Sequence, residues 1–510
     1  MPPTEPRTVP PQAIRDSSTG DPVAPLWRFR AGALLLGPLL ALIAAFALPE
    51  TFVAPGGGVE TLTPAARATV AMLVWMAAWW MTEAVPIEVT ALLPIVFFPL
   101  TGVARLGATL TPYASDVIFL FLGGFMVAAA MTRWGLDRRI AHATIGLAGD
   151  SPDRVIGGVM AATAFVSMWI SNSATAAMMV PIALSLIRLA GDGPEARRFA
   201  TALLLSVAYA SSIGGLGTVI GSPPNGIVVR YVEQTWQREI SFAQWMAIGL
   251  PLVLVLLPLA WLLLTRVLFR SGLGTLGGGP FARGHDLGPV SAGERGTLIV
   301  FCIAALAWLV RPLLVDLEVA GLRPLAGLSD AGIAVAAALA LFVWPVDLRR
   351  RRFLLDWESA STLPWGVLVL FGGGLSLASA IEANGVTRML AGMVHAIGDI
   401  AAPVALAAVV GASVFLSEVT SNTAQVAATT PVLAAIAPAL GIDRIAMVVA
   451  AACGASCAFM MPVGTPPNAI VFGTGRLTIG QMVRAGFWLN LIAIAVIVVH
   501  ALFWLPWVLG

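Results

Sequence analysis

The sequence predicts an all-α polytopic membrane protein with about 11 transmembrane helices and two re-entrant helical hairpins in an inverted repeat. Three observations lead to this fold class. The chain of 510 residues is 58% hydrophobic and only 11% charged, whereas soluble domains are about 45–50% apolar and about 25% charged. Apolar stretches of spanning length recur, and several motifs occur twice in the same order. This composition excludes a secreted enzyme, a nucleic-acid-binding protein and a disordered scaffold.

The N-terminal segment and the uninterrupted apolar stretches set the membrane topology. Residues 1–26 are rich in Pro, Ser and Asp, which predicts a disordered cytoplasmic tail. All 29 basic residues are arginine, and their distribution places the N-terminus in the cytoplasm and the C-terminus outside. The apolar segment 363–384 contains three consecutive glycines. The stretches with the length of a full span are 31–49, 68–83, 86–103, 116–134, 243–268, 296–314, 329–346 and 482–508.

Four further apolar stretches are interrupted by polar, glycine or proline clusters: 154–190, 199–229, 403–440 and 443–474. Every backbone N–H and C=O must be satisfied within hydrocarbon, so a helix breaks there only where its freed groups line a cavity or meet a ligand. We therefore expect 154–190 and 403–440 to be re-entrant hairpins that enter from opposite sides.

The second half of the chain repeats motifs of the first. FLFLGGF at 119–125 corresponds to VLFGGGL at 369–375, and Asn172 corresponds to Asn422, both at a separation of 250 residues. GSPPN at 221–225 corresponds to GTPPN at 464–468, at a separation of 243. The predicted topology makes the two halves inverted repeats. Inverted repeats with interrupted helices in matching positions are typical of secondary transporters, whose site lies near the midplane of the membrane.

The interruptions carry chemistry suited to ions. Ser-Asn-Ser at 171–173 and Ser-Asn-Thr at 421–423 supply hydroxyls and amides that donate and accept hydrogen bonds. A hairpin turn also exposes the positive N-terminal end of a helix, which favours an anion. The paired prolines at 223–224 and 466–467 must break their helices, and the freed carbonyl oxygens suit Na⁺.

Three segments resemble the divalent anion/sodium symporter family of carboxylate transporters. They are WWMTEAVPIEVTALLP at 79–94, SEVTSNTA at 417–424 and ASCAFMMPVGTPPNAIV at 455–471, the last being similar to the family's sodium-symporter signature. The resemblance runs from about residue 68 to the C-terminus. It implies a homodimer in membrane lipid, with a scaffold domain and a transport domain that moves as an elevator.

The resemblance divides the chain and assigns its site residues. The first repeat supplies scaffold helices at 27–153 and a transport-domain hairpin and broken helix at 154–242. The second supplies a linking helix and scaffold helices at 243–402, then a hairpin, broken helix and last span at 403–510. The substrate contacts that it implies are Ser171, Asn172, Ser173, Ser222, Pro223, Ser421, Asn422, Thr423, Thr465 and Pro466. The implied Na⁺ ligands are Ser167, Ser171, Asn172 and Gly221 at one site, and Ser417, Thr420, Asn422, Gly464 and Pro466 at its twin.

The expected function is Na⁺-coupled symport of C4-dicarboxylates (succinate, malate, fumarate) or citrate across the cell membrane, with a bacterial inner membrane indicated by the arginine bias. Neither tip nor break contains Arg or His, so co-transported Na⁺ is the simplest counter-charge for a dianion. A Na⁺-independent dicarboxylate or citrate antiporter is the alternative. Ser173 stands where the family usually has Thr, which leaves a sodium–sulfate symporter open as well. The chain contains no pattern typical of an enzyme active site.

One acidic residue lies in the second hairpin itself. Glu418 precedes Asn422 by four residues, and an ionisable side chain at membrane depth is a candidate functional group. Two roles are compatible with its position: an acceptor that orients the hairpin, or a proton site.

Overall fold

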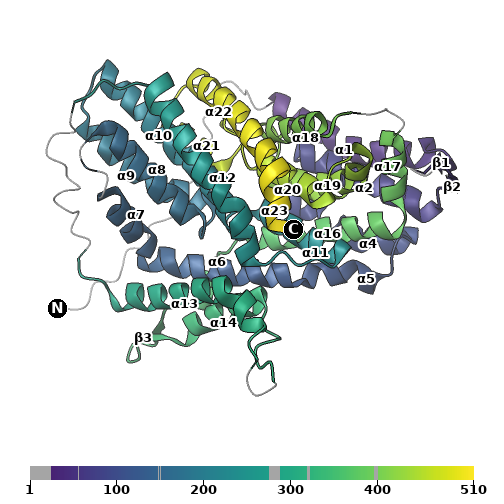
Figure 1. Ribbon diagram of the computed structural model, residues 1–510, viewed down its shortest axis with the longest axis horizontal. Helices are drawn as coiled ribbons and strands as arrows, with labels where there is room; N and C mark the ends of the chain where they lie inside the picture. Colours follow the sequence, from purple (N-terminus) through teal and green to yellow (C-terminus); the bar gives the residue numbers. More distant parts are fainter. Residues whose placement is uncertain are drawn as a thin grey trace, which may run out of the picture.

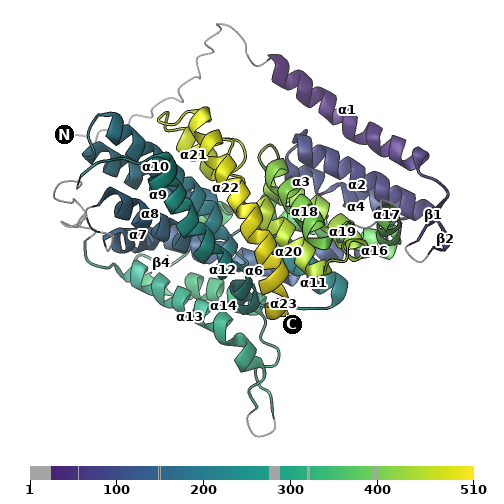
Figure 2. The same ribbon diagram turned by 45° about the horizontal axis from the view of Figure 1, so that its top comes forward.

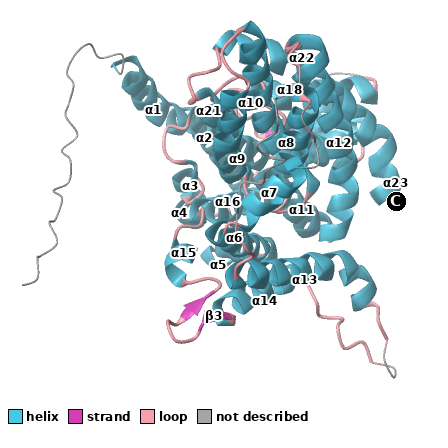
Figure 3. Ribbon diagram, turned by 90° about the vertical axis from the view of Figure 1, so that its left-hand side faces the viewer, coloured by secondary structure: helices cyan, strands magenta, loops and turns pink. Residues whose placement is uncertain are grey.

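The computed structural model describes residues 24–54, 57–146, 149, 151–274, 288–318, 322–395 and 400–509. The described chain is almost entirely helical (Figure 3). Most of the predicted tail, residues 1–23, lies outside the described residues, and α1 (Ala24–Ala47) already includes positions 24–26. Eight described helices are long and apolar enough to cross a membrane, and five shorter apolar helices accompany them. The prediction of an all-α polytopic membrane protein is confirmed.

The first half of the chain contains α1 to α12. After α1, the helices are α2 (Pro64–Thr82), α3 (Ile87–Thr90), α4 (Leu93–Thr101), α5 (Leu106–Leu110), η1 (Thr111–Ala114), α6 (Asp116–Trp134), α7 (Leu136–Gly146), α8 (Pro152–Ser167), α9 (Asn172–Leu189), α10 (Pro194–Gly214), η2 (Gly215–Gly217), α11 (Pro223–Trp236) and α12 (Phe242–Leu262), which continues as the π-helix η3 (Leu263–Leu268). The strands β1 (Thr51–Val53) and β2 (Val59–Thr61) pair antiparallel between α1 and α2.

The second half follows the same plan. Its helices are α13 (Ala292–Val315), α14 (Asp330–Val343), α15 (Trp357–Ser361), α16 (Trp365–Ala383), α17 (Val386–His395), α18 (Ala402–Ser417), α19 (Asn422–Ile436), η4 (Ala437–Leu440), α20 (Arg444–Ala455), α21 (Pro466–Phe472), α22 (Ile479–Val499), η5 (His500–Trp504) and α23 (Leu505–Leu509). The short strands β3 (Pro345–Asp347) and β4 (Arg352–Phe353) pair antiparallel after α14. Figure 1 shows α22 crossing the molecule between α8–α10 on one side and α18–α20 on the other.

The predicted uninterrupted span 86–103 is wrong, because the helix is broken between α3 and α4. The break frees the carbonyl of Ala91, which accepts a hydrogen bond from the Tyr113 hydroxyl. A Cβ on Gly373 of α16 would lie 2.6 Å from the Ala91 Cα. The close approach of α16 and the tyrosine contact are tertiary features that hydropathy does not encode.

The same close approach occurs in the other half of the chain. A Cβ on Gly123 of α6 would lie 2.5 Å from the carbonyl carbon and oxygen of Ala334 in α14. Gly123 and Gly373 are 250 residues apart, and Ala91 and Ala334 are 243 apart. The glycine repeat therefore marks an equivalent helix crossing in each half. In Figure 2, α13 and α14 extend from the lower side of the molecule, and α1 lies along α2 on the upper side.

The interrupted helices form as predicted. The chain turns at 168–171 between α8 and α9 and at 418–421 between α18 and α19. Contacts across the repeats connect these hairpins with the broken helices: α9 packs against α21, and α19 packs against α11. Each hairpin therefore contacts the helix that follows the break in the opposite half.

Candidate functional site

The two hairpin tips begin their second helices in the same way. Ser171 is the N-cap of α9 and accepts a hydrogen bond from the Ala174 N–H at 3.4 Å. Ser421 is the N-cap of α19 and accepts from the Ala424 N–H at 3.5 Å. These caps are long, and the three residues of each tip, including Ser173, are half-buried. The positive ends of α9 and α19 are therefore accessible to an anion.

A serine–asparagine pair closes each hairpin. The Ser167 Oγ donates to the carbonyl oxygen of Ser211 at 2.7 Å and lies 2.8 Å from the end of the Asn172 amide. In the second repeat, the Ser417 Oγ lies 2.7 Å from the Asn422 Oδ1. Both serines are fully buried. Each serine–asparagine contact joins the base of a hairpin to its own tip.

The amide of Asn172 lies among oxygen atoms. In the present orientation its oxygen faces only acceptors, and an exchange of its O and N atoms would let the nitrogen donate to the Gly221 carbonyl at 3.2 Å and the Ser211 carbonyl at 3.1 Å. A Cβ on Gly215 would lie 2.9 Å from the Asn172 Nδ2, so glycine leaves room for the amide. Several acceptor oxygens around one point can be satisfied by a donated N–H or by a bound cation, and hard oxygen ligands suit Na⁺.

The breaks after α10 and α20 are each held by an asparagine. The Asn225 Nδ2 donates to the carbonyl oxygens of Gly215 and Thr218, both at 2.8 Å. The Asn468 Nδ2 donates to those of Ala458 at 3.2 Å and Met461 at 3.0 Å. Both asparagines are fully buried, and the Oδ1 atom of each has no hydrogen-bond partner among the described residues.

The remaining predicted contacts lie at the two breaks. Ser222 and Thr465 are buried N-caps of α11 and α21, and the Thr465 hydroxyl accepts from the Asn468 N–H at 3.3 Å. Pro223 is half-buried and Pro466 is exposed. Each hairpin contacts the helix after the opposite break, so the elements that carry the predicted residues of the two repeats pack against each other.

Two predicted residues have neighbours that the sequence did not indicate. The Thr420 hydroxyl donates to the Leu416 carbonyl at 2.9 Å within its own hairpin. Gly464 is buried, and a Cβ there would lie 2.8 Å from the Oε2 of Glu418. A carboxylate therefore lies directly beside the predicted second Na⁺ site.

Comparison with known proteins shows the family of the chain. Residues 36–510 match the family described as the sodium:sulfate symporter transmembrane region. The chain belongs to the sodium:sulfate symporter family. The resemblance to divalent anion/sodium symporters is thereby confirmed, and the protein is a transporter rather than an enzyme.

Two relatives of this protein are similar to it in sequence over most of its length. The sodium-dependent dicarboxylate transporter SdcS of Staphylococcus aureus strain NCTC 8325 is 41% identical over 498 residues, which cover 94% of this chain and 93% of the relative. SdcS of strain MRSA252 is also 41% identical, over 490 residues, 94% of this chain and 91% of the relative.

Solved structures show the same fold at low sequence identity. The Alcanivorax borkumensis YdaH transporter is 16% identical and superposes with a TM-score of 0.62, covering 95% of this chain and 98% of that chain. Neisseria gonorrhoeae MtrF is 13% identical, with a TM-score of 0.56 and 96% coverage of both chains.

Two buried asparagines at the breaks were not among the predicted site residues. Asn225 and Asn468 are the last residues of the repeated GSPPN and GTPPN motifs, and their identity in both copies was the available signal. The carbonyl of Ser211 had no such signal, because any residue presents a backbone oxygen. Only the packing of α10 against α8 and α9 places it beside Asn172.

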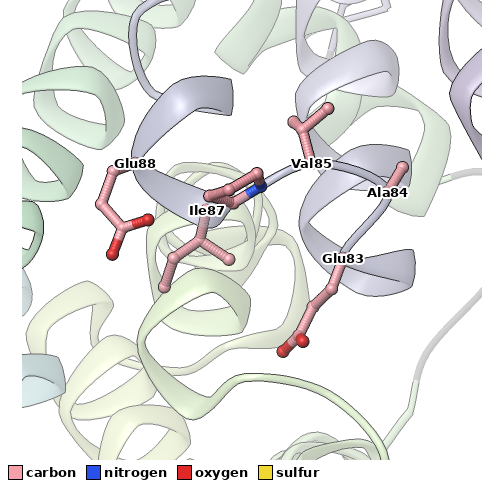
Figure 4. A pocket seen from close by; sticks show the side chains of 6 residues that line it. Glu83, Ala84, Val85, Ile87 and Glu88 are labelled. Atoms are coloured by element: carbon pink, nitrogen blue, oxygen red, sulfur yellow. The ribbon is translucent and has the colours of Figure 1, made fainter. Parts of the chain in front are cut away.

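A cavity of about 350 Å³ lies away from the hairpin tips. It is lined by residues 83–88, between the end of α2 and the start of α3. Figure 4 shows Ile87 between the side chains of Glu83 and Glu88. Glu83 ends α2 in the left-handed region, with φ of 46°. The protein thus has two acidic side chains, Glu83 and Glu88, at a cavity that is separate from the tip residues.

Proposed function

We propose that this protein is a Na⁺-coupled symporter that carries C4-dicarboxylates across the cell membrane. The observation that supports this function is the doubled arrangement of hairpin tip and broken helix, in a chain 41% identical to a sodium-dependent dicarboxylate transporter. The tips offer helix N-termini and hydroxyls to an anion, and the breaks offer oxygen ligands to a cation. Ser171, Asn172, Ser173 and their counterparts Ser421, Asn422 and Thr423 are the proposed substrate contacts. Ser222, Pro223, Thr465 and Pro466 are proposed to complete the wall.

Two Na⁺ sites are proposed at the hairpin bases. Asn172, Ser167, Ser171 and Gly221 are proposed as ligands of the first site, joined by the carbonyl oxygen of Ser211. Ser417, Thr420, Asn422, Gly464 and Pro466 are proposed for the second. No ion pair among the described residues involves a residue of the tips or breaks. Bound Na⁺ is therefore the simplest source of positive charge to balance a dianion.

We also propose the quaternary and dynamic properties that the family relationship suggests. The hairpins and broken helices would move as one transport domain against the remaining scaffold helices, within a homodimer embedded in lipid. The N-terminus would face the cytoplasm of a bacterial cell and the C-terminus the outside. Single cysteines placed in the α13–α14 and α22–α23 regions test this orientation. Each is labelled in intact cells with a thiol reagent that crosses the membrane and, separately, with one that cannot.

Uptake of radiolabelled succinate into proteoliposomes tests the function. We expect uptake into empty vesicles under an inward Na⁺ gradient and none when choline replaces Na⁺. Uptake that requires internal succinate and does not depend on Na⁺ would instead establish exchange of one anion for another. Competition by unlabelled malate, citrate and sulfate then ranks the anions, and strong competition by sulfate alone would contradict the dicarboxylate assignment.

A further inference from the structure

The carboxylate of Glu418 is buried and fully hydrogen-bonded. The residue is only 4% exposed. Its Oε1 accepts from the backbone N–H groups of Phe459 at 2.8 Å and Met460 at 2.9 Å, and its Oε2 from that of Met461 at 2.8 Å. The Asn490 Nδ2 of α22 also donates to Oε1, at 2.7 Å. Glu418 therefore connects the second hairpin tip to the turn that follows α20 and to the last long helix.

These donors satisfy the lone pairs of Glu418 but do not neutralise its charge. No ion pair among the described residues includes Glu418. Its hydrogen-bond donors among the described residues are three backbone amides and one neutral side chain. A buried charge without an opposite charge is costly, and the backbone of Gly464 in the proposed second Na⁺ site lies beside its Oε2.

The first repeat makes the same connection without a charge. Met168 is the counterpart of Glu418, 250 residues earlier, and Thr218 is the counterpart of Met461, 243 residues earlier. The Thr218 hydroxyl donates to the backbone carbonyl of Met168 and accepts from the Gly221 N–H at 3.0 Å. The turn after α10 is therefore tied to its hairpin by a neutral contact, and the turn after α20 by a carboxylate.

We propose that Glu418 is the fixed counter-charge of the second Na⁺ site and makes that site the tighter of the two. This inference rests on the proposed Na⁺-coupled function. Glu418 acts as a positioning residue through the turn at 459–461 and through its charge, without coordinating the ion. Because Met168 supplies no charge in the first repeat, the two Na⁺ sites of the inverted repeat are not equivalent.

Na⁺-dependent thermal stabilisation of the purified full-length protein tests the counter-charge in the absence of any dicarboxylate. Glu418→Gln removes the charge and keeps the side-chain length. Asn490→Leu is the matched control, because it removes one hydrogen bond to the same carboxylate and keeps the charge. We expect Glu418→Gln to raise the Na⁺ concentration for half-maximal stabilisation roughly tenfold or more, and Asn490→Leu to change it less than about threefold. The half-saturating succinate concentration, measured in uptake at saturating Na⁺, should change less than the Na⁺ requirement.

The outcomes separate this inference from the function on which it rests. Wild-type protein that is stabilised by Na⁺, with equal Na⁺ requirements in Glu418→Gln and wild type, would overturn the counter-charge role. Equal shifts in Glu418→Gln and Asn490→Leu would also overturn it, since they would indicate hydrogen bonding alone. If Glu418→Gln does not fold, Glu418→Asp is compared with Asn490→Leu, and a Na⁺ requirement for Glu418→Asp raised tenfold would refute the role of charge. Wild-type protein that gains no stability from Na⁺ would contradict the proposed function itself.

Discussion

Substitution of Gly215 by alanine probes the proposed first Na⁺ site without altering any ligand. The backbone of Gly215 has φ of −57° and ψ of −19°, which alanine adopts without strain. Its Cβ, however, would lie 2.9 Å from the Asn172 Nδ2 and closer still to Oδ1, whereas ordinary contact begins near 3.4 Å. The Asn172 amide must therefore retreat by more than about 0.5 Å from the Gly221 and Ser211 carbonyls.

The magnitude follows from the loss of one ligand to a charged group. Such an interaction contributes about 1.5–3 kcal/mol, which corresponds to an increase of about 10-fold to 150-fold in the Na⁺ concentration for half-maximal uptake. The assay is Na⁺ activation of radiolabelled succinate uptake in proteoliposomes, together with thermal unfolding of the purified protein. Gly411→Ala in α18 is the matched control, because the nearest atom to its Cβ, the Ile494 Cδ1, lies at 3.8 Å.

We expect Gly411→Ala to keep the wild-type Na⁺ activation curve and Gly215→Ala to shift it. A Gly215→Ala protein whose curve superimposes on the wild type would refute the placement of the Na⁺ site at Asn172. Equal loss of thermal stability in the two variants would indicate a general packing effect instead.

Three further predictions concern the helix crossing, the second break and an exposed ion pair. Gly123→Ala places a Cβ 2.5 Å from the Ala334 carbonyl group. This overpacking should destabilise the protein by about 1–3 kcal/mol and lower its unfolding temperature. An unchanged unfolding temperature would contradict this close packing. Asn468→Asp removes the side-chain donor to two carbonyl oxygens of the second break and should reduce succinate uptake at least tenfold. Uptake within twofold of wild type would show that the turn keeps its conformation without these two hydrogen bonds. The pKa of Asp356 lies below its ordinary value of 3.8 because the Ser359 backbone N–H and then Arg133 stabilise the carboxylate. Its contribution to stability is therefore fully present above that ordinary value and is lost as the pH falls further, through the lowered pKa of the folded state. The difference in unfolding temperature between wild type and Asp356→Asn should be constant from about pH 7 to pH 5 and should begin to shrink only below about pH 4. A difference that grows on acidification would refute this.

Local chemistry determined much of this protein from its sequence. Long apolar stretches can only be satisfied as helices in a membrane, and the paired prolines at 223–224 and 466–467 cannot continue a helix, so spans and breaks follow from composition and order alone. The hairpin tips were identified on the same grounds, because Ser-Asn-Ser and Ser-Asn-Thr interrupt apolar stretches at matching places in the two halves. Repetition of these features then predicted a transporter before any contact was known.

Tertiary structure decided which of these local features meet. Hydropathy carries no information on helix partners, so it did not indicate that α16 and Tyr113 contact Ala91, where a predicted span is broken. It did not indicate that each hairpin contacts the opposite repeat, or that Ser211 presents a backbone oxygen to Asn172. Glu418 could be recognised as an acceptor from its position, but its donors lie more than 40 residues away along the chain. Long-range packing brings them together, and a pattern along one segment cannot encode that distance.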